Sequence, residues 1–180
     1  MRIIAGTWRG RPIAAPAGDS TRPTADRVRE ALFSMLTSRL GSFEDLLVLD
    51  AFAGTGALGL EALSRGAARA TFIEHDRKAV DVLRANVATL GAEANILGQR
   101  VETLGAATAQ HHVALLDPPY GENLAAPALV RLAERGWLAP QALVSVETGR
   151  TETVEAPGFT LDVTRHHGKA LLHLLRYVGG

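Results

Sequence analysis

The sequence predicts an α/β fold with a mostly parallel sheet, helices on both faces and an antiparallel hairpin at its C-terminal end. Three observations predict this class. Short apolar runs alternate with amphipathic stretches from residue 46 onward, glycines follow several of these stretches, and the last two apolar segments have no helical stretch between them. With 180 residues, 47% of them hydrophobic, we expect residues 1–180 to form a single domain.

The beginning of the chain is expected to form a small extension over residues 1–23. Pro12, Pro16 and Pro23 disfavour a helix there, because proline lacks the amide hydrogen that a helix interior requires. Residues 2–4 and 11–14 flank two glycines, a pattern that indicates a short hairpin. Apolar residues then recur at helical spacing up to Gly41, which predicts the first helix.

Seven apolar segments predict the strands of the sheet. We expect them at residues 46–51, 70–74, 95–97, 113–117, 142–147, 160–163 and 170–177. Amphipathic stretches predict helices at residues 57–65, 76–90 and 124–135. The last apolar segment also fits a helix, but a turn at His166, His167 and Gly168 would pair it with its predecessor as a hairpin at the sheet edge.

Composition and patterning exclude several classes of protein. The chain has no cysteine, which excludes a disulfide scaffold, a thiolate zinc site and a cysteine nucleophile. No apolar run approaches the roughly 18–20 residues that span a bilayer, and the N-terminus has no apolar signal core. His111 and His112 lack carboxylate partners at ligand spacing, so we expect no metal site. We therefore expect a cytoplasmic protein, with a monomer as the default assembly.

Positive charge is concentrated near the N-terminus, although the formal net charge of the chain is zero. Residues 1–40 hold seven arginines against three acidic residues, and the rest of the chain is correspondingly acidic. Either these arginines form a solvated surface or they bind a polyanion. Arginine outnumbers lysine by 17 to 2, which suits bidentate contacts with phosphate.

A strand, a glycine turn and a helix are expected in succession from residue 47. Gly54 and Gly56 allow a sharp turn and the close approach of a ligand to the backbone, and Gly59 allows the helix to pack closely on the strand. Glu74 ends the next strand, where a carboxylate can accept hydrogen bonds from both hydroxyls of a ribose. This combination predicts a Rossmann-like cofactor site. Its expected binding residues are Asp50, Phe52, Ala53, Gly54, Thr55, Gly56 and Glu74.

The same glycine pattern also matches the fingerprint of dinucleotide-binding proteins. Asp50 lies four residues before Gly54, and a carboxylate there would repel a pyrophosphate but attract the ammonium or sulfonium group of S-adenosylmethionine. The chain is also short for a dinucleotide domain with a separate substrate domain. These points favour S-adenosylmethionine and leave a small NAD-dependent oxidoreductase as an alternative.

The tetrapeptide Asp117-Pro118-Pro119-Tyr120 follows a buried strand, at the sheet edge where α/β proteins bind ligands. The prolines fix the backbone before substrate arrives. The Asp117 carboxylate and the Pro118 carbonyl can each accept a hydrogen bond from an exocyclic amine, and the Tyr120 ring offers a face for base stacking. We expect these four residues to be catalytic, mainly through positioning. Glu147 ends a later strand at this edge and is a candidate to line the pocket.

These motifs and the N-terminal sequence resemble the bacterial 16S ribosomal RNA (guanine(966)-N2)-methyltransferase family of class I S-adenosylmethionine-dependent enzymes. Many enzymes that methylate exocyclic amines share Asp-Pro-Pro-Tyr. The segment Arg22-Pro23-Thr24-Ala25-Asp26-Arg27-Val28-Arg29-Glu30 is far more specific to this family, and the similarity extends over nearly the whole chain.

The resemblance implies methylation of a guanine 2-amino group in 16S ribosomal RNA, with the assembled small ribosomal subunit as substrate and the target base out of its stack. It assigns RNA contacts to five N-terminal residues: Arg9, Arg11, Arg22, Arg27 and Arg29. His75, Gln99 and Asp117 complete the expected cofactor contacts, with Gln99 where related enzymes often carry Asp or Asn. Another RNA guanine or a DNA adenine remains an alternative target, because the tetrapeptide suits all these amines.

Overall fold

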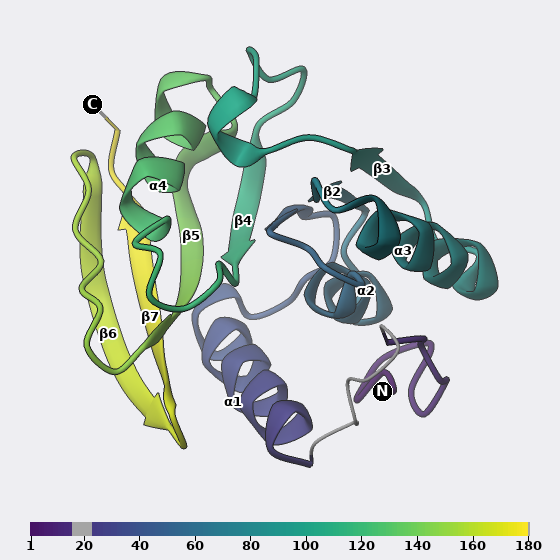
Figure 1. The fold of residues 1–180 in the computed structure, drawn as a ribbon. Coiled ribbons are helices and arrows are strands. Elements are labelled where there is room, and N and C mark those ends of the chain that lie inside the picture. Colours follow the sequence, from purple (N-terminus) through teal and green to yellow (C-terminus); the bar gives the residue numbers. More distant parts are fainter. Residues whose placement is uncertain (16–22, 180) are drawn as a thin grey trace.

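The computed structural model describes residues 1–15 and 23–179, which form a seven-stranded sheet with helices on both faces (Figure 1). The strands are β1 (Leu47–Ala51), β2 (Arg69–Ile73), β3 (Ala94–Leu97), β4 (His111–Leu116), β5 (Leu138–Gly149), β6 (Phe159–His167) and β7 (Ala170–Tyr177). Their order across the sheet is β3-β2-β1-β4-β5-β7-β6. Strands β1 to β5 are parallel, and β7 is antiparallel to both β5 and β6. The predicted fold class is therefore confirmed, including the C-terminal hairpin at the sheet edge.

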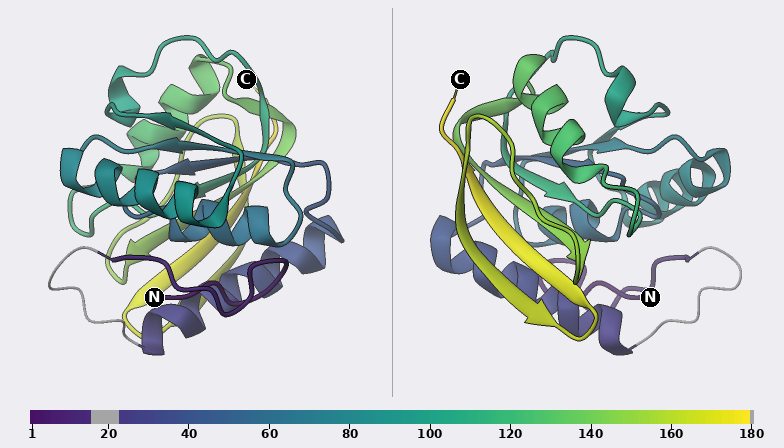
Figure 2. Two further views of the ribbon diagram at one scale, coloured as in Figure 1. Left: turned by 90° about the vertical axis from the view of Figure 1, so that its right-hand side faces the viewer. Right: turned by 60° about the vertical axis from the view of Figure 1, so that its left-hand side comes forward.

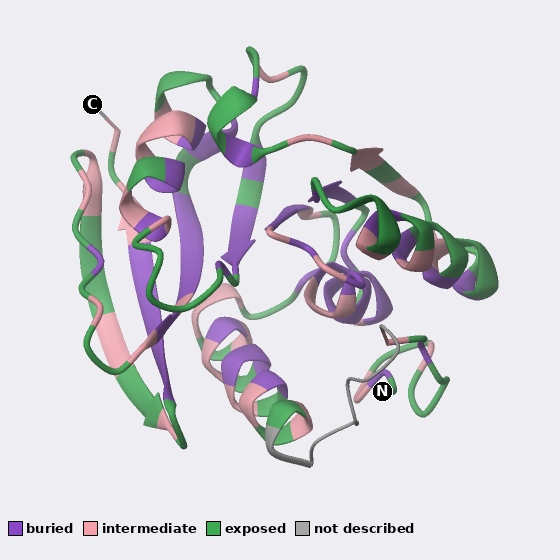
Figure 3. Cartoon of the chain, viewed as in Figure 1, coloured by how far each residue is buried: buried purple, intermediate pink, exposed green. Residues whose placement is uncertain are grey.

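The helices are α1 (Pro23–Leu40), α2 (Ala57–Ser64), α3 (Arg77–Leu90) and α4 (Ala125–Glu134), with a 3-10 turn η1 (Val101–Thr103) before β4. One apolar core lies between the sheet and α1, α2 and α3, and a second lies between the sheet and α4 with η1 (Figure 2). Figure 3 shows the resulting pattern, with buried central strands and exposed outer helix faces. Within the described ranges, no helix has the length and apolarity to cross a bilayer.

The strand order changes direction between β1 and β4, which are neighbours in the sheet. Ala51 and Leu116, the last residues of these strands, are register partners, and the Asp117 amide donates to the Ala51 carbonyl at 3.4 Å. The glycine turn and the Asp117 segment therefore start side by side. This is the topological switch point at which open α/β sheets bind ligands.

Strand β6 is longer than the predicted segment 160–163, whereas β7 has the predicted bounds. His166 and His167 belong to β6, opposite Leu171 and Ala170 of β7, so the prediction that both histidines lie in the turn was wrong. Because β6 is an edge strand, mostly exposed along its length, its polar composition resembles that of a turn. Gly168 and Lys169 make the turn itself.

The predicted N-terminal hairpin is present. The Ile3 amide donates to the Arg11 carbonyl at 3.0 Å, and the Gly10 amide donates back to the Ile3 carbonyl at 2.9 Å. The hairpin packs against α2 through a residue that the sequence analysis did not single out. Glu61 is fully buried, and its carboxylate accepts hydrogen bonds from the Ile4 and Ala5 amides at 2.8 and 3.0 Å.

Candidate active site

The turn between β1 and α2 contains three positions with left-handed backbone geometry: Phe52, Gly54 and Gly56, with φ of 61°, 55° and 83°. The φ of Gly56 favours glycine, and a Cβ there would also lie 2.3 Å from Leu83 Cδ1 of α3. A Cβ at Gly54 would meet nothing within 4 Å, so the space beside its backbone is open. The turn therefore forms a cradle that lets a ligand approach the main chain.

Backbone and side-chain hydrogen bonds fix this turn. The Ala53 amide donates to the Ile73 carbonyl at 3.0 Å, and the Thr55 carbonyl accepts from Asn86 Nδ2 of α3 at 3.0 Å. Asn86 also exchanges two hydrogen bonds with the Ala14 backbone. The N-terminal segment is thereby connected to the glycine turn through one buried side chain.

Glu74 lies directly against the glycine turn. Its Oε2 accepts a hydrogen bond from the Gly54 amide at 2.8 Å, and its Oε1 accepts from the His75 and Asp76 amides at 2.7 and 2.8 Å. The carboxylate is thus held at the carboxyl end of β2 by three backbone donors. This is the place where the sequence analysis expects a ribose acceptor.

Asp50 is almost completely enclosed, with 1% of its surface exposed. Its Oδ2 accepts the Gly59 amide at 2.8 Å, so the side chain caps the first turn of α2, whose N-cap residue Gly56 has no side chain to do so. Burial raises the pKa of Asp50 well above its usual range, and the charges of Asp117 and Glu74 raise it further. Three carboxyl groups, one near the end of β1 and two directly after β2 and β4, therefore gather at the switch point.

His75 and Gln99 lie at the same edge of the sheet. His75 is exposed, with its Nδ1 3.5 Å from Glu74 Oε1. Gln99 follows β3. Its backbone amide donates to the Leu97 carbonyl, which also accepts a hydrogen bond from the Glu74 backbone amide. Both residues therefore lie near Glu74, at the carboxyl ends of β2 and β3.

The four residues from Asp117 to Tyr120 directly follow β4 and differ in how far they are exposed. Asp117 and Pro119 are exposed, Pro118 is buried, and half of the Tyr120 surface is exposed. Although part of its side chain reaches solvent, desolvation by the surrounding protein raises the pKa of Asp117 to about 7, and the charge of the Glu147 carboxylate raises it further. A carboxyl group with this pKa changes charge near neutral pH.

Glu147 and Tyr120 form a hydrogen-bonded pair beside Asp117. The Tyr120 hydroxyl donates to Glu147 Oε1, and burial together with this bond raises the pKa of Tyr120. The ring also lies beside Gly149, where a Cβ would be 3.8 Å from Tyr120 Cβ. From the sequence, Glu147 is only a candidate to line the pocket. The structure places it in contact with Tyr120 of the Asp-Pro-Pro-Tyr segment.

The structure separates the N-terminal arginines into different environments. Arg9, Arg11 and Arg27 are exposed, although Arg11 also donates to the Thr89 carbonyl at 2.6 Å. Arg29 does not fit the RNA contact expected of it, because its side chain is only 5% exposed and donates to the Arg2 carbonyl and to Asp26. Arg22 lies outside the described residues.

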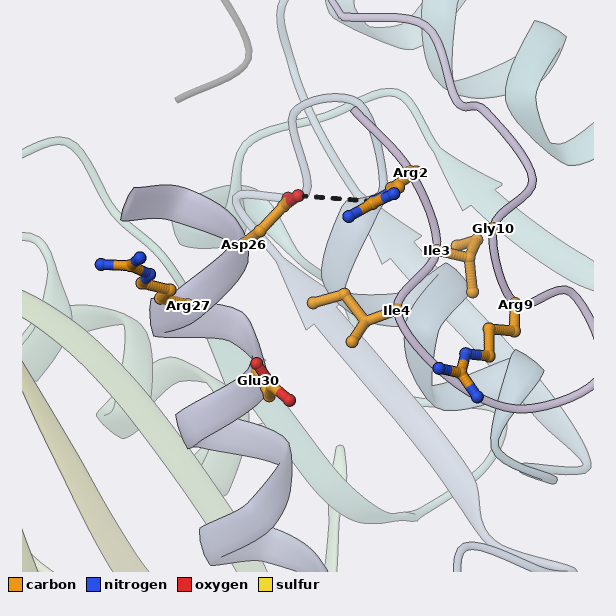
Figure 4. A pocket seen from close by; sticks show the side chains of 8 residues that line it. All are labelled: Arg2, Ile3, Ile4, Arg9, Gly10, Asp26, Arg27 and Glu30. Atoms are coloured by element: carbon orange, nitrogen blue, oxygen red, sulfur yellow. Dashed lines mark ion pairs between the residues drawn. The ribbon is translucent and has the colours of Figure 1, made fainter. Parts of the chain in front are cut away.

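A groove separates the N-terminal hairpin from α1, with a cavity of about 390 Å³ (Figure 4). The Arg9 side chain enters from the hairpin and Glu30 from α1, while Arg27 points away along the outer side of the helix. An adjoining cavity of about 560 Å³ shares Arg9 and Glu30 and continues along α1 to Ser38. The groove is therefore polar and open along the helix.

The glycine turn, the acidic strand ends and the Asp-Pro-Pro-Tyr segment, all at the switch point of this sheet, define the class as a methyltransferase. The sequence model of the family described as "Conserved hypothetical protein 95" matches residues 1–176, and the chain belongs to this family.

Named relatives agree with this class. The chain is 41% identical over 163 residues to "Ribosomal RNA small subunit methyltransferase D" of Haemophilus influenzae, covering 87% of this chain and 83% of that protein. It is 44% identical over 150 residues to the protein of the same name from Escherichia coli K12, covering 82% and 74%. A solved Escherichia coli structure, 39% identical, matches with a TM-score of 0.86 over 100% of this chain and 99% of the other.

Proposed function

We propose that this methyltransferase transfers a methyl group from S-adenosylmethionine to the 2-amino group of a guanine in 16S ribosomal RNA, of the guanine-966 type. The observation that carries the proposal is the register of β1 and β4. Because Ala51 and Leu116 are paired, the glycine turn and the Asp117 segment open on one edge, within reach of a shared pair of ligands. The choice of small-subunit ribosomal RNA as the substrate rests on the names of the relatives.

The residues of the switch point fit S-adenosylmethionine. The open space beside Gly54 gives room against the main chain, and Glu74 is held where it can accept ribose hydroxyls. The three carboxyl groups of Asp50, Glu74 and Asp117 favour a cationic ligand over a pyrophosphate, which argues against a dinucleotide. When bound, S-adenosylmethionine supplies an electrophilic methyl group and leaves as S-adenosylhomocysteine.

At the target amine, Asp117 and Pro118 act as hydrogen-bond acceptors. The ionised Asp117 carboxylate accepts one hydrogen of the amine and the Pro118 carbonyl accepts the other, which directs the nitrogen lone pair toward the methyl group. Tyr120, half exposed on the same loop, stacks on the base. A new N–C bond forms as the S–C bond breaks, and the extra proton leaves to Asp117 or to solvent. Such a reaction needs the base out of its stack.

Two basic surfaces flank this edge and bind RNA phosphates. The first includes three exposed arginines: Arg9, which lines the groove, Arg27, which lies on the outer side of α1, and Arg11 of the N-terminal hairpin. The second lies at the β6–β7 turn. This turn is at the carboxyl edge of the sheet, because Gly149 at the end of β5 pairs with Ala170 at the start of β7. The exposed residues of this second surface are Arg150, Arg165, His166 and Lys169. Phosphate contacts on both sides would hold the RNA across the site.

The whole chain acts as one methyltransferase domain, with its N-terminal segment as part of the RNA surface. We expect the substrate to be the assembled small subunit, because the positive charge is local and ribosomal surfaces can complete the recognition. We also expect a cytoplasmic monomer.

The test is the transfer of labelled methyl from S-adenosylmethionine to small subunits that lack the modification, followed by mapping of the labelled nucleotide. The expected result is one labelled guanine in 16S RNA, modified at N2. Titration calorimetry should show binding of S-adenosylmethionine and no binding of NAD. Label in an adenine, or in no nucleotide, would contradict the proposal.

A further inference from the structure

We propose that Glu147 selects guanine by accepting the hydrogen on its ring nitrogen N1, beside the amine held by Asp117. This inference rests on the proposed function and goes one step beyond it. The tetrapeptide holds an exocyclic amine, which adenine, cytosine and guanine all possess. A second group must therefore decide which base reacts.

The sheet places Glu147 and Asp117 next to each other. Leu116 of β4 and Val146 of β5 are register partners, so the two carboxyl groups belong to the following residues of adjacent parallel strands. Such strands lie about 4.8 Å apart. The influence of Glu147 on the pKa of Asp117 agrees with this closeness.

Tyr120 fixes the orientation of Glu147. Its hydroxyl donates to Glu147 Oε1, and in the described part of the chain no hydrogen bond engages Glu147 Oε2. Glu147 is half-buried, and its Oε2 remains able to accept a hydrogen bond while Oε1 is engaged by Tyr120. Because Tyr120 is also the residue on which the base stacks, the free oxygen lies near the edge of that base.

Guanine is the base whose edge matches two adjacent carboxylates. It presents two neighbouring donors, the N1 hydrogen and the 2-amino group. Adenine and cytosine present an amine beside a ring nitrogen that is an acceptor, and that lone pair would face the Glu147 carboxylate. An acceptor opposite an acceptor loses a hydrogen bond and adds repulsion. The pair of Asp117 and Glu147 therefore favours guanine.

The experiment compares two target bases in reconstituted small subunits, guanine and 2,6-diaminopurine. Both carry the 2-amino group, but N1 of 2,6-diaminopurine is an acceptor. The wild-type protein is expected to methylate guanine with a kcat/KM at least about 10-fold higher, the discrimination of one hydrogen bond to a charged group. In Glu147→Gln the new amide can donate to N1, so this preference should fall to about 3-fold or reverse.

Two further variants keep the test decisive. Glu122→Gln makes the same charge change at an exposed residue of the loop that carries Asp117 and Tyr120. This control variant should keep the wild-type preference for guanine. Tyr120→Phe keeps the ring but frees Glu147, and should lower the guanine preference without changing S-adenosylmethionine affinity. An unchanged preference in folded Glu147→Gln, with guanine still methylated by the wild type, would overturn this inference alone. Failure of the wild type to methylate guanine would overturn the proposed function as well.

Discussion

At the scale of single residues, the same chemical group takes different roles according to its surroundings. Asp50 is the second-last residue of β1, Asp117 directly follows the neighbouring β4, and both carboxyl groups have raised pKa values. Asp50 is enclosed and caps α2 through the Gly59 amide, whereas Asp117 reaches solvent on a proline-fixed loop. The sequence places both near the cofactor, but only burial shows which carboxyl group is free to meet a substrate.

The pH dependence of catalysis follows from Asp117. We expect kcat/KM to rise with pH through about 7, because the ionised carboxylate is the form that accepts the amine hydrogen. Glu147→Gln removes a neighbouring negative charge, so the rise should move to lower pH. Methyl-transfer rates from pH 5.5 to pH 9, with constant ionic strength, check this. A profile that does not shift in the variant would show that Glu147 does not act on Asp117.

Stability should respond to Asp117 in the opposite sense. The folded pKa of about 7 lies above the usual 3.8, so the favourable contribution of this group is complete below about pH 3.8 and is lost as the pH rises through 7. Asp117→Asn removes the unfavourable charge. We expect this variant to lose activity and to gain a few degrees in Tm at pH 8. Equal Tm values at pH 8 would argue against a destabilising carboxylate.

At the scale of elements, α2 connects the cofactor side of the molecule with the N-terminal hairpin. Its first turn is capped by Asp50 of β1, and its middle carries Glu61, which binds the hairpin backbone. Glu61 also accepts from Arg65 Nε at 2.9 Å and lies 3.8 Å from Arg29 Nε. One short helix therefore positions both the glycine turn and the hairpin side of the groove.

Loss of the Glu61 carboxylate should be severe for stability. Glu61→Ala leaves the Ile4 and Ala5 backbone amides without their acceptor and removes the carboxylate 3.8 Å from the buried Arg29 Nε. Removal of one partner of a buried pair costs about 3–5 kcal/mol. Urea unfolding followed by circular dichroism measures this change. Glu93→Ala, at an exposed site on the loop before β3, should stay within about 0.5 kcal/mol of wild type. Similar losses in both variants would contradict the role of Glu61.

At the scale of the whole molecule, the distribution of charge is uneven although the positive and negative charges balance. The net charge is zero, yet exposed basic residues lie along the groove and at the β6–β7 turn. These are the two surfaces that we propose to bind RNA phosphates. This arrangement predicts a salt-dependent association with the small subunit.

The salt dependence of binding tests these surfaces. We expect Arg27→Gln and Lys169→Gln each to weaken subunit binding and to reduce the slope of log K against log salt by about 1. Arg69→Gln removes an exposed arginine from the beginning of β2, at the opposite edge of the sheet, and should leave the slope unchanged. Binding measured between 50 and 200 mM salt (about the range over which such slopes are resolved) gives the comparison. Equal slopes in all three variants would exclude these phosphate contacts.

Local sequence patterns were sufficient to predict most of the architecture. Alternating apolar runs and glycine stops gave the strand and helix order, because their periodicity and turn chemistry act within a few residues. The main error, the two histidines placed in the hairpin turn, arose because an edge strand is polar on its exposed face. The glycine turn and the tetrapeptide were identified for the same local reason.

The sequence by itself determined the fold class, the positions of Gly54 and Asp117 at strand ends and an excess of arginine near the N-terminus. The tertiary structure decided which charged groups are available: it buries Arg29 against Asp26 and Glu61, and it sets Glu147 beside Asp117. These facts depend on burial and on neighbours that are far apart in the chain. Periodicity carries no information about either, because it describes only how each segment folds and not what it meets.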